Sequence, residues 1–218
     1  MFRVILYTQW KWSRLIVLLR SVAGFALPIV SVQGAARADA SPLVPAELLR
    51  TVQSWGVLYP VLAATLGLLV AIATWTPDHR GRHVHALLLP VPRWRYVLLR
   101  FGAGATLLAA PILAVTAGAL LATWSATIPA GLQGYPATLA VRFALAVLVA
   151  FSVFFAVAAG TARTAGIILA LIGAVIVVQI IAHVASVDLD LLGKLQIVIL
   201  NWPGPLAIFA GRWMLIDV

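Results

Sequence analysis

Long apolar runs separated by short polar or basic segments make up most of this sequence. No charged side chain occurs in residues 51–77, 101–141 or 164–187. About 20 apolar residues in a helix cross the ~30 Å hydrocarbon layer of a membrane, so runs of this length predict transmembrane helices. The run at 101–141 is long enough for two helices. It divides at Trp124–Pro136, where Pro and Gly favour a turn and Trp and Tyr favour the membrane interface. The pattern therefore predicts spans at residues 55–75, 97–123, 137–160 and 165–186.

The two ends of the chain have a less regular pattern. Residues 1–14 mix apolar residues, aromatics and cations, which is typical of an amphipathic helix lying on the membrane surface. Residues 15–33 then predict a first span. The alternative is a secretory signal peptide, since residues 34–40 (GAARADA) offer small-x-small cleavage sites. Residues 195–213 are apolar but interrupted by NWPGP, which predicts either a broken sixth span or a re-entrant segment.

Composition favours a membrane protein. Of the 218 residues, 63% are hydrophobic and 10% are charged, and a soluble domain of this length cannot bury so much apolar surface. The formal net charge of +9 fits basic cytosolic segments that face anionic headgroups, so we expect no nucleic-acid partner. Because the chain has no cysteine, a disulfide framework and a thiolate metal site are excluded. The predicted fold is an all-α polytopic membrane protein with five to six transmembrane helices.

The basic residues predict the orientation of these helices. Arginines and lysines concentrate in residues 1–14 and 76–100 and at Arg163, which the predicted spans place on one side of the membrane. The connections on the opposite side contain four of the six acidic residues. By the positive-inside rule, the basic side faces the cytosol. We therefore expect a multi-pass protein of the inner (plasma) membrane with a cytosolic N-terminus.

Residues 76–101 (TPDHRGRHVHALLLPVPRWRYVLLRF) hold five of the 15 Lys and Arg residues and three of the four His. Val84, Leu87 and Leu88 have the i, i+3, i+4 spacing of a short amphipathic helix, and the two prolines of residues 90–92 end it. A short helix joined by a rigid corner to a transmembrane helix can transmit a push from a cytosolic partner to a span. The alternative is a basic loop that only fixes the topology.

An ordered set of residue types runs through the same stretch: an acidic residue, a Gly, a Leu-rich turn, a Pro-x-x-Arg motif and a further Arg leading into the third predicted span. These are Asp78, Gly81, Leu87, Leu88, Pro90, Arg93 and Arg100. The arrangement resembles the cytosolic loop of the ABC-2-type exporter permeases. The resemblance implies a cytosolic coupling helix between spans two and three, an ATPase subunit on a separate chain, and a second permease chain, identical or homologous. The residues that it assigns to coupling with the ATPase are Asp78, Arg80, Gly81, Arg82, Leu87, Leu88, Pro90, Pro92 and Arg93.

Motifs for catalysis or cofactor binding are not found in the sequence. A P-loop needs a lysine followed by Ser or Thr in a Gly-rich context, and neither of the two lysines has it. His79, His83 and His85 do not have the pattern of a metal site, because the last two would lie about 200° apart on a helix. The few carboxylates are scattered. We therefore expect no enzyme activity, no metal and no cofactor in this chain, and ATP hydrolysis only in a partner.

Three polar residues within predicted spans are candidates for a substrate pathway. Gln179 and His183 lie four residues apart on one helix face, and Arg142 lies one to two turns into the fourth span. Intramembrane polar groups tend to face the bundle interior or a water-filled path. The alternative is an interhelical hydrogen bond for the pair and snorkelling of Arg142 toward the headgroups.

Two other functions stay open. A non-transporting scaffold or accessory subunit of another membrane complex predicts an unrelated partner and no dependence on nucleotide. A secondary transporter is less consistent with the spans, which lack the paired acids that a proton or sodium route usually needs. The sequence does not select a substrate.

Overall fold

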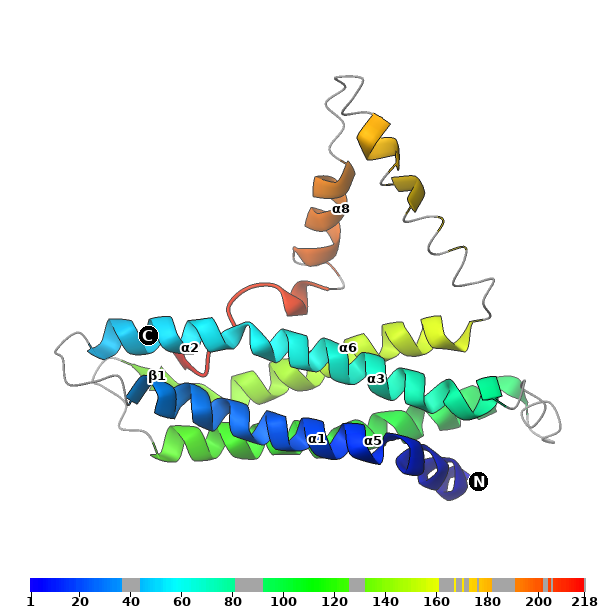
Figure 1. Cartoon of the computed structure of the whole chain (residues 1–218), viewed down its shortest axis with the longest axis horizontal. Helices are drawn as coiled ribbons and strands as arrows, with labels where there is room; N and C mark the ends of the chain where they lie inside the picture. Colours follow the sequence, from blue (N-terminus) through cyan, green and yellow to red (C-terminus); the bar gives the residue numbers. More distant parts are fainter. Residues whose placement is uncertain are drawn as a thin grey trace. The chain divides into compact units, whose positions relative to one another are not determined.

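The computed structural model describes residues 1–36, 44–80, 92–125, 132–160, 167, 170, 173–175, 177–181, 191–201, 204 and 206–217. They fall into two compact units, of which the first comprises Met1–Phe155 with Arg212–Val218 and the second Ala156–Gly211. Most of the described residues are helical, as the sequence predicted (Figure 1).

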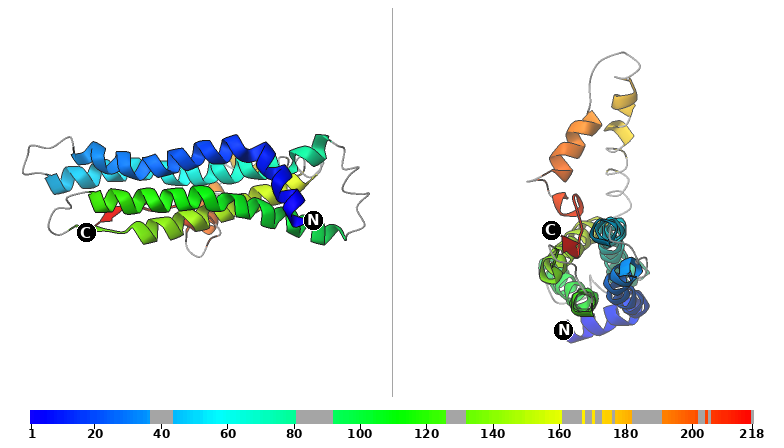
Figure 2. Two further views of the ribbon diagram at one scale, coloured as in Figure 1. Left: turned by 90° about the horizontal axis from the view of Figure 1, so that it is seen from below. Right: turned by 90° about the vertical axis from the view of Figure 1, so that its left-hand side faces the viewer.

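Long helices build the first unit, and Figure 2 shows them side by side. The elements are α1 (Phe2–Ala36), α2 (Val44–Gly56), α3 (Leu58–Arg80), α5 (Arg93–Ser125) and α6 (Pro136–Ala159), the last of which ends in the second unit. Within the described part of the chain, four segments are long and apolar enough to cross a membrane: Phe2–Gln33, Val52–Pro77, Arg93–Ser125 and Pro136–Ala159. A membrane-embedded protein follows from these segments.

These helices agree with the spans predicted at 55–75, 97–123 and 137–160, with ends that differ by a few residues. The N-terminal region differs in form. The sequence predicted an interfacial helix at 1–14 and a span at 15–33, whereas α1 is one continuous helix through both. Its first turns bend away from the rest (Figure 2). Their position at the membrane surface stays a prediction.

Helix α2 was not predicted, because the charges of Glu47 and Arg50 interrupt the apolar pattern there. It leads into α3 almost in line (Figure 1). Pro60 occupies the first turn of α3, where a missing N–H removes no bond within the helix.

Helices α1 and α5 run in the same direction and approach closely at two glycines. A Cβ atom at Gly24 would lie 2.7 Å from a methyl carbon of Val115. A Cβ at Gly118 would clash with the backbone of Phe25. On α3, Gly67 allows a similar approach to α6, since its Cβ would lie 2.6 Å from the Phe151 nitrogen. Small residues at such contacts let helices pack without a strong hydrophobic drive between them.

Serine and threonine hydroxyl groups within the spans donate to carbonyl groups of their own helices. Thr74 donates to the Val70 carbonyl at 2.8 Å, and Ser13 donates to the Gln9 carbonyl at 2.8 Å. The same i to i−4 bond occurs at Ser21, Thr116 and Ser152. These groups therefore need no polar partner on another helix.

The second unit contains α8 (Leu191–Leu200) and a 3₁₀ turn, η1 (Ala207–Phe209). Helix α8 ends immediately before the NWPGP interruption, and the Leu206 N–H donates back to the Ile199 carbonyl at 2.9 Å. In the predicted fifth span, 165–186, the described residues (167, 170, 173–175 and 177–181) are helical. The fifth and sixth spans stay predictions.

A small antiparallel pair modifies the all-α expectation. Strand β1 (Gln133–Gly134) pairs with β2 (Ile216–Asp217), with Gln133 opposite Asp217. The Tyr135 N–H continues the ladder to the Leu215 carbonyl at 2.8 Å. The end of the chain thus lies beside the connection between α5 and α6, at the end of the first unit away from the N-terminus.

The glycine contacts predict opposite effects for two similar substitutions on α5. Gly118→Ala should lower stability by about 1–3 kcal/mol, because the new methyl group overlaps the backbone of Phe25. Gly102→Ala should leave stability unchanged or slightly higher, since the nearest atom to its new Cβ is a Phe2 ring carbon at 3.8 Å. Thermal unfolding of both variants in detergent measures the difference. Equal midpoints would show that α1 and α5 do not pack through Gly118.

The pairing of β1 with β2 predicts the sidedness of the C-terminal region. Helix α6 leads away from β1 and residue 212 returns to it, so residues 160–211 should cross the membrane an odd number of times. With one span at 165–186, the segment 195–213 would then be re-entrant.

The cysteine-free chain allows a clean test of this topology. Single cysteines at Ser125 and Arg212 should react with a membrane-impermeant maleimide from the same side of the membrane, and one at Arg95 from the other. All three positions are exposed in the structure. Labelling of Arg212→Cys from the Arg95 side would rule out the odd number.

Candidate functional sites at the two ends of the first unit

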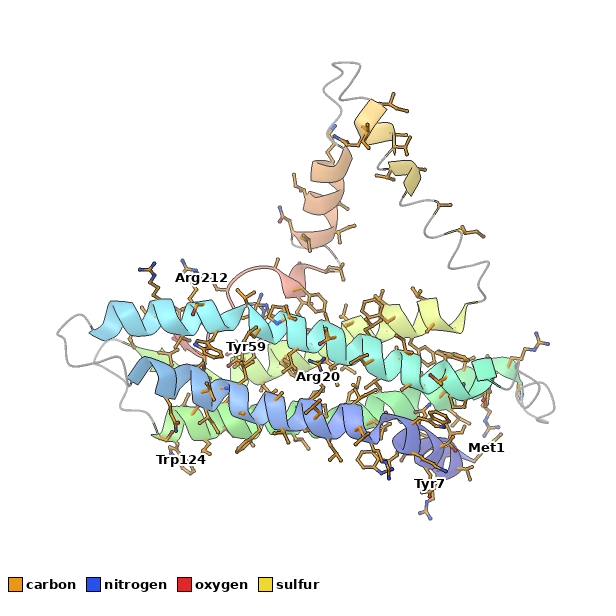
Figure 3. The ribbon with its side chains drawn as sticks, in the orientation of Figure 1. Met1, Tyr7, Arg20, Tyr59, Trp124 and Arg212 are labelled. Atoms are coloured by element: carbon orange, nitrogen blue, oxygen red, sulfur yellow. The ribbon has the colours of Figure 1, made fainter. Side chains whose placement is uncertain are left out.

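The end of the first unit that carries the N-terminus is rich in exposed cations. Figure 3 shows Met1 and Tyr7 there, and Trp124 at the opposite end. The exposed basic residues of this end are Arg3, Lys11, Arg14, Arg93 and Arg95. Trp94, which is 65% exposed, lies among them. An aromatic residue beside cations is typical of a helix end at the headgroup level.

One cation of this end is buried instead. Arg100, the last residue of the motif read from the sequence, is 4% exposed. Its guanidinium carbon lies 5.1 Å from the ring centroid of Trp75 and 5.1 Å from that of Tyr96. A cation against two aromatic faces is stabilised by the ring quadrupoles, more strongly where water is excluded.

The surroundings of Arg100 join all four of the long apolar helices. Buried Gln9 of α1 donates from Nε2 to the Arg100 carbonyl at 3.1 Å. The Trp75 indole of α3 donates to the Phe155 carbonyl of α6 at 3.2 Å. We call Gln9, Trp75, Tyr96, Arg100 and Phe155 the arginine junction.

Aromatic rings extend the arginine junction toward the core. Phe101, Phe151 and Phe155 lie within 5.2–5.5 Å of one another, centroid to centroid. The Trp75 ring lies 5.2 Å from that of Phe155. Such pairs add about 0.5–1.5 kcal/mol each beyond the area they bury, so the junction is held firmly.

The predicted coupling segment begins and ends at this junction. Helix α3 ends at Arg80, so Asp78 and Arg80 occupy its last turn. Helix α5 begins at Arg93, and the carbonyl of exposed Pro92 accepts the Tyr96 N–H at 3.2 Å. The remaining predicted residues, Gly81, Arg82, Leu87, Leu88 and Pro90, lie outside the described residues, as do His83, His85 and the side chain of His79.

At the opposite end, the C-terminal segment closes against the helices. Trp213 is 4% exposed and stacks on Tyr59 of α3, with centroids 6.4 Å apart and planes 11° from parallel. Gly56 makes room for it, because any Cβ there would clash with the Trp213 backbone. Figure 3 shows Tyr59 and Arg212 toward the Trp124 end.

We call the packing of the C-terminal segment, through Trp213, against Gly56 and Tyr59 the C-terminal closure. Arg142 also contacts this closure. Its guanidinium carbon lies 4.7 Å from the Trp213 ring centroid, and its Nη1 donates to the Arg212 carbonyl at 2.5 Å. Of the three predicted pathway residues, Gln179 is half-buried in the second unit and His183 lies outside the described residues. The structure therefore gives Arg142 contacts within the first unit, and a shared pathway with Gln179 and His183 stays a prediction.

Comparisons of the chain with protein families, curated proteins and solved structures found no match.

Sequence reasoning missed the partners in both sites. Gln9 is a lone amide in a segment rich in aromatics, and its burial depends on the helix that packs against it. Tyr59 and Trp213 stand 154 positions apart in the sequence, so no local pattern could pair them. Only the tryptophans near the helix ends hinted at these sites, and they were interpreted as markers of the membrane–water interface, not as residues that contact Arg100 or Tyr59.

The closure predicts unequal roles for two tryptophans at the same end. Trp213→Ala should destabilise the protein by about 3–5 kcal/mol and release the C-terminal segment, because it removes a buried ring together with the face under Arg142. Trp124→Ala should change stability by less than about 0.5 kcal/mol, since that side chain is 91% exposed.

Thermal unfolding and protease cleavage of a C-terminal tag linker would measure both effects. Cleavage of the two variants at the same rate would contradict the closure.

Proposed function

We propose that this chain is the permease subunit of an ABC-2-type, ATP-driven exporter. It lies in the inner membrane with a cytosolic N-terminus. A separate ATPase subunit supplies ATP hydrolysis, and a second permease chain, identical or homologous, completes the substrate pathway.

The arginine junction is the observation that supports this proposal best. A coupling segment has to be joined to helices that move together with the rest of the membrane domain. The segment is joined to the end of α3 and the start of α5. These two helices contact α1 and α6 at the arginine junction through Arg100, Gln9 and Trp75. A push on the segment between Arg80 and Arg93 would therefore reach four helices together.

The distribution of charge supports the orientation. Exposed arginines and lysines gather at the end where the coupling segment starts and ends, whereas the first charge on α6 is Arg142, which contacts the closure. Cytosolic enrichment of cations is the strongest orientation signal in membrane proteins. The same cations would face an acidic surface on the ATPase subunit.

The packed interior of the first unit supports a pathway formed with a second chain. Leu66, Val70, Leu108, Val115 and Phe151 are fully buried between its helices. A polar route cannot run through this core. Gln179 and His183 stay candidates for the pathway, while the contacts of Arg142 favour a structural role.

The residues proposed to couple with the ATPase are Asp78, Arg80, Gly81, Arg82, Leu87, Leu88, Pro90, Pro92 and Arg93. A matched pair of charge reversals tests them. Arg93 and Arg50 are both exposed, the first beside the coupling segment and the second on α2.

The tagged chain, purified in mild detergent, should carry vanadate-sensitive ATPase activity. Arg93→Glu should reduce this activity by about tenfold, because one reversed charge at an interface typically costs over 1 kcal/mol of association. Arg50→Glu should retain it.

Insertion of all variants into the membrane, checked by the yield of folded protein, is the control. Equal ATPase activity in the two variants would refute coupling through this segment. Co-purification of an unrelated membrane complex, with no ATPase, would instead identify the chain as a scaffold or accessory subunit.

A further inference from the structure

A pocket opens beside the C-terminal closure, at the end of the first unit opposite the coupling segment. Its volume is about 250 Å³. It is lined by the first turns of α6 and by the C-terminal segment: Tyr135, Thr138, Leu139, Arg142, Arg212, Trp213, Met214 and Asp217. Pockets for drug-sized ligands usually measure about 300–1,000 Å³, so this one suits a smaller group.

The charges of the lining favour a singly charged anion. Two arginines, Arg142 and Arg212, stand against one carboxylate, Asp217, which leaves one net positive charge. Arg142 is already engaged by the Trp213 ring and the Arg212 carbonyl. The Arg212 side chain is exposed at the rim. A guanidinium fork is well suited to phosphate oxygens.

Neutral hydrogen-bond donors near the two arginines would also favour an anion in the pocket. Thr138 has an exposed hydroxyl on the first turn of α6. The Ala137 and Thr138 N–H groups precede the first bond of that helix, which runs from the Leu139 N–H to the Tyr135 carbonyl at 3.1 Å. Unpaired N–H groups at the start of a long helix favour a negatively charged group.

The remaining lining indicates where the anion would come from. Tyr135 and Trp213 combine an apolar ring with a polar edge, and Leu139 and Met214 are apolar. The fully exposed Trp124 marks the same end of the unit. This mixture is typical of the zone between headgroups and acyl chains.

We propose that this pocket binds the phosphodiester headgroup of a membrane phospholipid, with Arg212 and Thr138 contacting the phosphate. The carboxylate of Asp217 disfavours a phosphomonoester with two charges. The site does not depend on the proposed transport function, because it lies at the other end of the unit from the coupling segment.

Native mass spectrometry of the delipidated chain offers a direct test. The probes are phosphatidylethanolamine, phosphatidic acid and an uncharged diacyl glycolipid with the same acyl chains. Phosphatidylethanolamine should be retained roughly fivefold better than the glycolipid, which is the gain expected of one charge-assisted contact. Phosphatidic acid should be retained less well than phosphatidylethanolamine.

Two variants locate the binding. Arg212→Gln and Thr138→Val should each remove most of the preference for the phospholipid, while Arg95→Gln, an exposed arginine at the other end, should keep it. An unchanged preference in Arg212→Gln, or equal retention of the glycolipid, would overturn the proposal. Displacement of the lipid by millimolar glycerophosphoethanolamine or inorganic phosphate would assign the pocket to a soluble phosphate and overturn the lipid source.

Discussion

The burial of the Arg100 guanidinium between aromatic rings is the interaction on which the rest of this molecule depends. A charge removed from water costs several kcal/mol unless its surroundings compensate, and here the faces of Trp75 and Tyr96 do so. Helix α3 supplies the Trp75 ring and α5 supplies the Tyr96 ring. Gln9 and the Phe155 carbonyl then bring in α1 and α6. Contacts around one buried cation thereby join four long apolar helices at the end where the proposed coupling segment starts.

The two ends of the first unit differ in their exposed charge and in their packing. The N-terminal end exposes many cations and leaves them free to meet anionic headgroups or an acidic partner. The other end mixes acidic and basic residues and is closed by the C-terminal segment, through the stack of Trp213 on Tyr59 and the β1–β2 pair. In the proposed exporter, this closure would hold the helices together at the end opposite the coupling segment.

Much of the fold could be read from the sequence, because lipid imposes a strict rule on length and polarity. The spans that became α3, α5 and α6 are long apolar runs with at most one charge each and with aromatic or proline boundaries, and their ends lie within a few residues of prediction. Helix α2 was missed because its charged residues interrupt the apolar pattern from which the spans were predicted. The continuity of α1 was missed because an interfacial segment and a span have the same helical backbone and differ only in what surrounds them.

The sites could be predicted only in part, for a different reason. The basic motif around Arg93 and Arg100 is local and visible in the sequence, but the burial of Arg100 results from helices that meet there. Likewise Arg142 was read as an intramembrane polar group, while its contacts come from Arg212 and Trp213, about 70 residues away. Contacts of this kind depend on the C-terminal segment lying against the start of α6, and the periodicity of apolar residues does not predict which distant segments lie together.

Photo-crosslinking tests the central claim most directly, since it reports what touches the coupling end of the protein in its native membrane. A photoreactive phenylalanine analogue at Trp94, which is 65% exposed beside Arg93, should crosslink to a P-loop ATPase. The same analogue at Trp124, which is 91% exposed at the opposite end, should not. If Trp94 crosslinks only to lipid or to an unrelated membrane protein while the chain is inserted and stable, the chain is not an exporter permease.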